Sequence, residues 1–192
     1  MKKEIDYEKI KHAVRDIIEA LGDDPQREGL IETPDRVARM YGEIFEGMRY
    51  TNDEIAQMFD KCFETEKNRD LVLVKDIECF SYCEHHLALM YNMKCHVGYI
   101  PNGRVIGLSK IARICDMVCK RLQLQERICA DIAYIIQKVC KTEDVIVIVE
   151  GEHSCMTARG IKARGAKTRT SAIRGLFDSY HELRNEVYAL LK

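Results

Sequence analysis

The stretch YNMKCHVGYIPNGRVIGL, residues 91–108, decides the fold class. Apolar and polar side chains alternate over residues 91–99, which predicts a β-strand with one buried face. Residues 101–103, PNG, are typical of a turn, and residues 104–108 return to a strand-like pattern. We therefore predict a β-hairpin here, with His96 on its polar, exposed face.

The segments on either side of this hairpin are mostly helical in pattern. Thr33-Pro34 suits a helix start, with Thr33 as the N-cap and Pro34 as the first helical residue. The apolar run 145–149 predicts a buried strand that pairs with the Thr-rich segment 167–173. Apolar residues at three- and four-residue intervals predict helices over residues 7–21, 33–48, 52 onward, 111–122, 128–139 and 180–191.

The order of these elements is helices, a strand pair, a helix pair, a strand pair and a closing helix. Strands that occur in adjacent pairs favour an α+β fold, with an antiparallel sheet and helices on one face. The charged segment 64–70 is predicted to be a loop. It would separate an N-terminal helical region, residues 1–65, from a second region, residues 66–192, within one functional unit.

The composition excludes several classes of protein. The 192 residues include 30 Lys and Arg against 31 Asp and Glu, so the chain lacks the basic excess of a general nucleic-acid binder. The longest apolar runs are far shorter than the roughly 20 residues that a membrane-spanning helix needs. Nine cysteines without a secretory signal predict reduced thiols in a cytoplasmic protein, some of them available for metal binding or catalysis.

Two Cys/His motifs carry the chemistry that the sequence suggests. The first is Cys83-Glu84-His85-His86, in which Cys83 and His86 have the C-x2-H spacing that lets both bind one metal from a tight turn. The second is His153-Ser154-Cys155, directly after a predicted strand. One close pair plus a distant residue favours three ligands with an open fourth position, as in catalytic zinc sites, over a structural zinc. His85 and His153 would then be free to transfer protons near neutral pH.

Other cysteines and several basic residues have simpler, structural interpretations. Cys115 and Cys119 are spaced like a metal-binding pair, but both lie on the apolar stripe of a predicted helix, which indicates core packing. Arg127 is interpreted as an ion-pair partner rather than a ligand contact. A basic run in the C-terminal third is predicted to be a solvated loop, with phosphate binding or subunit contact as the alternative: Lys162, Arg164, Lys167 and Arg169. Core packing is also predicted for Cys62, Cys79, Cys95, Cys129 and Cys140.

Five motifs in register over nearly the whole chain resemble the GTP cyclohydrolase I family. They are Thr33-Pro34-Asp35-Arg36-Val37-Ala38, Cys83-Glu84-His85-His86, the segment 105–111 (VIGLSKI), the segment 123–127 (QLQER), and the segment 153–160 (HSCMTARG). Residues 170–177 also match. Two stretches depart from the usual pattern: Leu-Ala-Leu-Met after His86, and Arg169 in place of a smaller or apolar residue.

The resemblance implies a reaction and a set of roles. The family hydrolyses GTP at C8 of guanine, releases formate and forms 7,8-dihydroneopterin triphosphate, the first step of tetrahydrofolate and pterin biosynthesis. It implies one Zn²⁺ per subunit, with Cys83, His86 and Cys155 as ligands. It further implies that His85 assists proton transfer and that His153 is the general acid–base. Glu126 would accept hydrogen bonds from the guanine N1–H and 2-amino group, and Gln125 would complete the base pocket.

The resemblance also implies a triphosphate site and an assembly. Guanidinium and ammonium groups suit phosphate oxygens, and motif matching assigns this role to Arg36, Arg39, Lys110, Arg113 and Arg159, with Ser109 near the ribose or phosphates. The implied fold is the tunnelling fold, a four-stranded antiparallel sheet backed by two long helices. The implied homo-oligomer is a decamer of two stacked pentamers with sites between subunits, and no nucleic acid or membrane partner is expected.

Two rival functions remain open from the sequence. One is a nitrile-reducing enzyme on the same fold, which would need a nucleophilic cysteine in a different motif and a nicotinamide cofactor. The other is a non-catalytic purine- or pterin-binding protein with a structural zinc. The presence of both His85 and His153 beside the predicted ligands favours catalysis over either rival. The motifs do not distinguish zinc from iron at the metal site.

Overall fold

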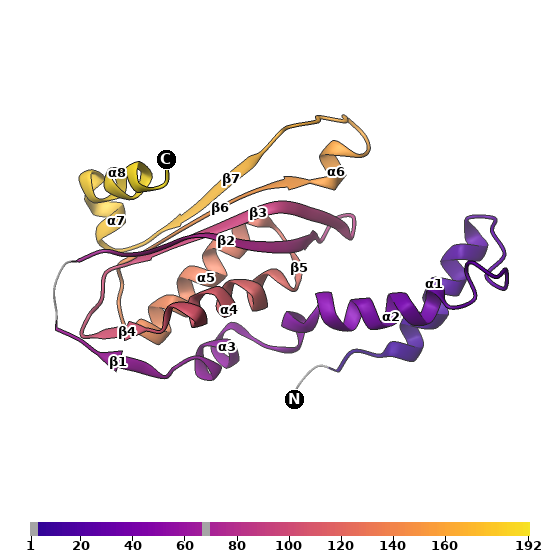
Figure 1. Ribbon diagram of the computed structural model, residues 1–192, viewed down its shortest axis with the longest axis horizontal. Helices are drawn as coiled ribbons and strands as arrows, with labels where there is room; N and C mark the ends of the chain where they lie inside the picture. The colour runs from indigo at the N-terminus through magenta and orange to yellow at the C-terminus, as the bar shows by residue number, and fades with distance from the viewer. Residues whose placement is uncertain (1–3, 67–69) are drawn as a thin grey trace.

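The computed structural model describes residues 4–66 and 70–192, and it consists of a twisted sheet with helices packed on its faces (Figure 1). The sheet has the strand order β5-β2-β3-β6-β7. Four of these strands are antiparallel, as the family resemblance implied: β2 (Val72–Cys83), β3 (Ala88–Tyr99), β6 (Val145–His153) and β7 (Thr168–Ile173). The sequence pattern predicted β3, β6 and β7 but not the strand β2. The prediction missed the fifth, β5 (Leu122–Gln123), which pairs in parallel with the end of β2.

Two helices cover one face of this sheet and form the main core with it. These are α4 (Leu108–Cys119) and α5 (Gln125–Cys140), which confirm the predicted helix pair. Apolar side chains along both helices are fully buried against β3 and β6, so this layer holds most of the hydrophobic stabilisation. The largest of the buried residues include Tyr99, Met93, Ile111, Ile114, Ile128 and Ile132.

The opposite face of the sheet is covered only at one end. There α7 (Leu176–Ser179) and α8 (His181–Leu190) pack on Ile146 and Ile148, with Phe177 fully buried between them and the sheet. This second layer explains why β6 is buried along most of its length and reads as a continuous apolar run in the sequence.

The predicted hairpin at residues 91–108 is wrong. β3 is paired with β2 on one side and with β6 on the other, so neither edge is free for the segment that follows the turn. That segment, β4 (Arg104–Ile106), instead pairs with β1 (Cys62–Glu64) in a separate two-stranded ribbon. The predicted loop 64–70 therefore begins at the end of a strand, and residues 67–69 lie outside the described residues.

His96 is also buried rather than exposed, with 7% of its surface accessible. Its Nδ1 accepts a hydrogen bond of 3.1 Å from the backbone N–H of Asp76, a residue with positive φ where the β2–β3 register shifts. Burial lowers the pKa of His96, which favours the neutral imidazole that this acceptor role requires.

The N-terminal region forms a helical arm. Helices α1 (Tyr7–Ala20) and α2 (Thr33–Ile44) pack on each other and extend away from the sheet (Figure 1). The predicted N-cap of α2 is wrong by one residue, because a turn in which the Thr33 N–H bonds to Leu30 already places Thr33 inside the helix. Helix α3 (Asn52–Met58) begins after Thr51, which forms a capping box with Glu54. No helix in the described residues combines the length and apolar character needed to cross a membrane.

One buried arginine fastens this region to the core. The guanidinium of Arg121 donates to the backbone carbonyls of Gly47 and Tyr50, at 3.1 and 3.0 Å, and to Asn52 Oδ1 at 2.7 Å. It also forms an ion pair of 3.2 Å with Asp131 of α5, and both side chains are largely buried. Gly47, in the 3₁₀ helix Glu46–Arg49, lies so close to α4 that a Cβ there would clash with the carbonyl oxygen of Met117.

We predict that Arg121→Met lowers the free energy of unfolding by about 3 kcal/mol, because it leaves Asp131 as an unpaired buried charge. Arg27→Met is the control, since Arg27 pairs with Asp23 on the exposed surface and its loss should change nothing measurable. Chemical denaturation of both variants measures the difference. Equal stability of Arg121→Met and the unmodified protein would contradict the assignment of Arg121 as the anchor.

Candidate active site

The first predicted metal motif is the turn between β2 and β3. Cys83 ends β2 and lies opposite Ala88, the first residue of β3. Leu87 adopts a positive φ of 52°, and the His86 N–H donates to the Cys83 carbonyl at 3.3 Å. The tight turn thus brings His86 back toward Cys83, as the C-x2-H spacing predicts.

The second motif reaches the same place through the sheet. His153 is the last residue of β6 and pairs with Met90 of β3, two residues beyond the turn. Cys155 follows in the single-turn helix α6 (Ser154–Thr157). Thr157 fixes this helix on β3, because its hydroxyl hydrogen-bonds Tyr91 at 2.9 Å and the His153 carbonyl at 3.2 Å.

The two motifs converge on one metal-binding group. The sulfur atoms of Cys83 and Cys155 and a ring nitrogen of His86 all lie within 4.8 Å of one another. Cys83 is buried, Cys155 is partly buried and His86 is exposed, so the group is closed on the core side and open toward solvent. Two thiolates and an imidazole are a donor set that zinc accepts, and three ligands leave one coordination position open.

The Cys155 thiol has a raised pKa. Burial and the neighbouring Cys83 sulfur raise the pKa of the Cys155 thiol, while Arg159 acts in the opposite direction. A divalent cation between the sulfurs would act in the same direction as Arg159, because its positive charge stabilises both thiolates. The observed donors therefore fit a bound metal ion.

His85 lies at the edge of this group. Its Nδ1 is 3.9 Å from the Cys83 sulfur, and its ring is nearly perpendicular to that of His86, at 87°. The side chain is exposed, so it can exchange protons with solvent. Its predicted role in proton transfer stays a prediction.

His153 is held by an amide that the sequence did not connect with it. Gln125, only 2% exposed, donates from Nε2 to the carbonyls of Val149 and Thr168, both at 3.0 Å, and to the Thr170 hydroxyl. Because Nε2 is occupied as a donor, Oε1 must be the atom that meets His153 Nε2, at 2.8 Å. His153 therefore carries its proton on Nε2 when it is neutral, and Nδ1 is left free to accept one.

The protonation of His153 is tuned by its surroundings. Burial lowers its pKa, and the Glu126 carboxylate partly opposes this effect. The neutral form with a free Nδ1 is therefore favoured near neutral pH. This is the state that a general base requires.

Comparison with known proteins gives the family. A model of GTP cyclohydrolase I matches residues 10–192. The chain is 58% identical over 193 residues to GTP cyclohydrolase 1 of Ruminiclostridium cellulolyticum, which covers 98% of this chain and 99% of that protein. The chain belongs to the GTP cyclohydrolase I family. The predicted identification as an enzyme of this family, a hydrolase, is confirmed.

Two further relatives cover the chain as completely. GTP cyclohydrolase 1 of Clostridium acetobutylicum is 58% identical over 192 residues, which is 98% of each chain. GTP cyclohydrolase 1 of Clostridium botulinum is 56% identical over 191 residues, which is 97% of each chain. The family assignment thus rests on nearly the whole chain, including the helical arm.

The remaining site residues predicted from the GTP cyclohydrolase I motifs are all at least partly exposed. Glu126 lies in the first turn of α5, close enough to His153 to affect its pKa. Lys110 on α4 donates to the Lys61 carbonyl. On α2, Arg36 forms an ion pair with Glu32, the N-cap residue of that helix, and Arg39 forms one with Asp35. Ser109 and Arg113 are exposed on α4, and Arg159 is exposed after α6. The roles of these residues with substrate, and that of Gln125 in a base pocket, stay predictions.

An ion pair across the site supports the turn. Arg127, predicted as a structural partner, pairs with Glu84 of the Cys83 motif at 2.6 Å and lowers the pKa of that carboxyl. The Glu84 N–H also donates to the Gln123 carbonyl of β5 at 3.1 Å. Both contacts join the turn to the start of α5, where Gln125 and Glu126 lie. Lys162, Arg164 and Lys167 are exposed in the segment before β7, as predicted for a solvated loop. Arg169 lies in β7 instead and pairs with Glu150.

We predict that the purified protein retains one zinc ion per chain after dialysis, and that Cys155→Ala loses it, measured by elemental analysis. The loss in affinity should exceed the roughly 10- to 100-fold that follows removal of a residue which only orients a ligand. Cys140→Ala is the control, because Cys140 is a buried thiol that lies outside the metal-binding group. Retention of zinc by Cys155→Ala would contradict the assignment.

We predict that Gln125→Glu raises the pKa of His153, because it places a carboxylate beside Nε2 and stabilises the imidazolium. Titration of His153 by NMR in the two proteins measures the shift. Gln137→Glu is the control, since Gln137 bonds to Glu143 on an exposed surface far along α5. A His153 pKa that is unchanged in Gln125→Glu would show that Gln125 does not set its protonation.

Proposed function

We propose that the protein hydrolyses GTP at C8 of guanine, releases this carbon as formate and forms 7,8-dihydroneopterin triphosphate, with one zinc ion held by Cys83, His86 and Cys155. The observation that carries the proposal is the convergence of these three ligands beside a histidine whose Nδ1 is kept free by Gln125. Membership of the GTP cyclohydrolase I family supports the substrate.

His153 and His85, which lie beside the metal-binding group, would carry out different proton transfers. When bound, zinc would act as a Lewis acid and lower the pKa of a bound water toward neutrality. His153 Nδ1 would take a proton from water as the water attacks C8 of guanine. It would then give that proton to the imidazole nitrogen of guanine as the ring opens. The Gln125 amide keeps Nε2 protonated through both steps. His85, exposed beside Cys83, would exchange protons with solvent.

Substrate recognition follows from the start of α5 and from local basic residues. The Glu126 carboxylate offers two acceptors to the guanine N1–H and 2-amino group, and the first turn of α5 places it near His153. Because the net charge is −1, the triphosphate must be held by a local cluster rather than by overall charge. The basic and hydroxyl groups proposed for this role lie on α2, on α4 and after α6, so more than one subunit would supply them: Arg36, Arg39, Ser109, Lys110, Arg113 and Arg159.

The proposal includes a homo-oligomer, a decamer of two stacked pentamers with sites shared between subunits. Two features support it. Within the described residues, the outer edge of β2 is paired at Tyr82 and Cys83 alone, and β7 is the opposite edge strand. Both edges therefore leave backbone groups for pairing with another sheet. The helical arm exposes Ile17, Leu21 and Ile31, which suits burial against another subunit. The free thiols and the GTP substrate fit a cytoplasmic enzyme.

Incubation of the zinc-loaded protein with GTP tests the proposal. We expect equimolar formate and 7,8-dihydroneopterin triphosphate, the latter measured by fluorescence after oxidation. His153→Ala should lower kcat by about 10²- to 10⁴-fold, because it removes the general acid–base. His12→Ala, at an exposed position on α1, is the control and should leave kcat unchanged.

Two outcomes would contradict the proposal. Tight binding of GTP without either product, in protein that holds its metal, would favour the binding-protein alternative. Formate without the pterin would indicate an enzyme that opens the ring but does not complete the rearrangement.

A further inference from the structure

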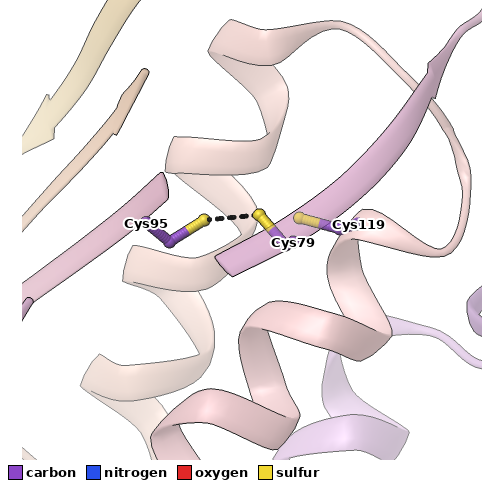
Figure 2. Close-up of side chains that lie close together, drawn as sticks. All are labelled: Cys79, Cys95 and Cys119. Carbon is purple, nitrogen blue, oxygen red and sulfur yellow. Dashed lines mark hydrogen bonds between the residues drawn. The ribbon is translucent and has the colours of Figure 1, made fainter. Parts of the chain in front are cut away.

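A second group of cysteines lies in the core, apart from the Cys83 group. Cys79 of β2, Cys95 of β3 and Cys119 at the end of α4 point toward one another, and their sulfur atoms all lie within 4.8 Å (Figure 2). The Cys79 and Cys95 sulfurs are 3.3 Å apart and share a hydrogen bond. The predicted core packing of the three is confirmed, but their positions in the sequence did not indicate that they meet.

The three thiols are sealed within the apolar core. Cys95 and Cys119 are fully buried and Cys79 is 5% exposed, all within the main hydrophobic cluster. Burial and the neighbouring sulfurs raise the pKa of Cys119 well above the usual value. An apolar environment favours neutral S–H groups over thiolates.

The spacing of the sulfurs suits a three-coordinate centre. With bonds of about 2.3 Å, as in zinc–thiolate sites, three sulfurs around one atom lie roughly 4 Å apart. The observed spacing, from 3.3 Å up to a limit of 4.8 Å, brackets this value. Within the described residues the group consists of these three cysteines alone, so it supplies three ligands and no fourth.

The charge of the complex then selects the ion. An uncompensated charge in the core is costly. Three thiolates would leave a charge of −2 around Cu⁺ and −1 around Zn²⁺. When all three thiols are deprotonated, a trivalent ion gives a neutral complex. Arsenic in the +3 state is a soft, trivalent ion that binds three sulfur ligands.

We propose that Cys79, Cys95 and Cys119 form a capture site for trivalent arsenic, taken up as neutral arsenous acid. Each thiol sulfur forms one bond to arsenic and each of the three As–OH bonds breaks. The three thiol protons leave with the three hydroxide groups as three water molecules. Arsenic stays in the +3 state and sulfur is neither oxidised nor reduced, so no further reactant is needed.

One of the three cysteines borders a cavity that opens to solvent. Cys79 and Met93 line a cavity of about 350 Å³ together with Phe80, Gly151 and Lys167, of which Phe80 and Lys167 are exposed. The ladder between β2 and β3 shifts register just beyond Cys79, at Ser81. The sheet is therefore irregular where a small neutral molecule would have to pass to reach the sulfurs.

The test adds arsenite to the reduced, zinc-loaded protein and measures the mass of the intact chain. We expect the mass of one arsenic atom minus three hydrogen atoms, and three fewer titratable thiols. Arsenic-edge X-ray absorption should show three sulfur ligands and no oxygen. Cys119→Ala should lose the adduct. Cys115→Ala is the matched control, because it is equally buried one turn earlier on the same helix and lies outside the group.

Further variants keep the test independent of folding and of the Cys83 group. Cys79→Ala and Cys95→Ala should each lose the three-sulfur adduct, with circular dichroism to confirm that they fold. Cys155→Ala should still form it, since Cys155 belongs to the other group. The proposal is overturned if the unmodified protein takes up no arsenic, if folded Cys119→Ala takes up as much, or if the adduct depends on Cys155.

Discussion

The register in which β3 pairs with β2 on one side and β6 on the other holds the candidate active site together. Cys83 faces Ala88 across the turn, and Met90 faces His153. These two pairings place Cys83 and Cys155, which are 72 positions apart in the sequence, in one group. A shift of one residue in either ladder would turn the side chains to opposite faces of the sheet and separate the ligands.

The same sheet also decides which groups tune the site. β5 pairs with the end of β2, so α5 starts beside the turn and brings Gln125 to His153 and Arg127 to Glu84. The histidine is partly buried by this packing, and its lowered pKa follows from the burial. The orientation of the imidazole and its protonation thus have one structural origin.

Local signals in the sequence predicted most elements, and the two short Cys/His motifs predicted the metal-binding group. The helices of residues 7–21 and 128–139 have clear apolar periodicity, and both formed. The hairpin at 91–108 was wrong because a local turn signal does not reveal that both edges of β3 are occupied. His96 looked exposed because alternation alone cannot show that the other face is covered. The Gln125–His153 contact and the Cys79 group depend on tertiary packing, so no spacing in the sequence could indicate them.

We propose that Cys83, His86 and Cys155 leave one position open on a catalytic zinc ion. Zinc-edge X-ray absorption of the purified, zinc-loaded protein tests it most directly. We expect the zinc ion to have two sulfur ligands, one imidazole nitrogen ligand and one oxygen ligand from water. Four protein ligands without oxygen would indicate a closed structural site, and three sulfurs would place the zinc at Cys79, Cys95 and Cys119; either result would contradict the account.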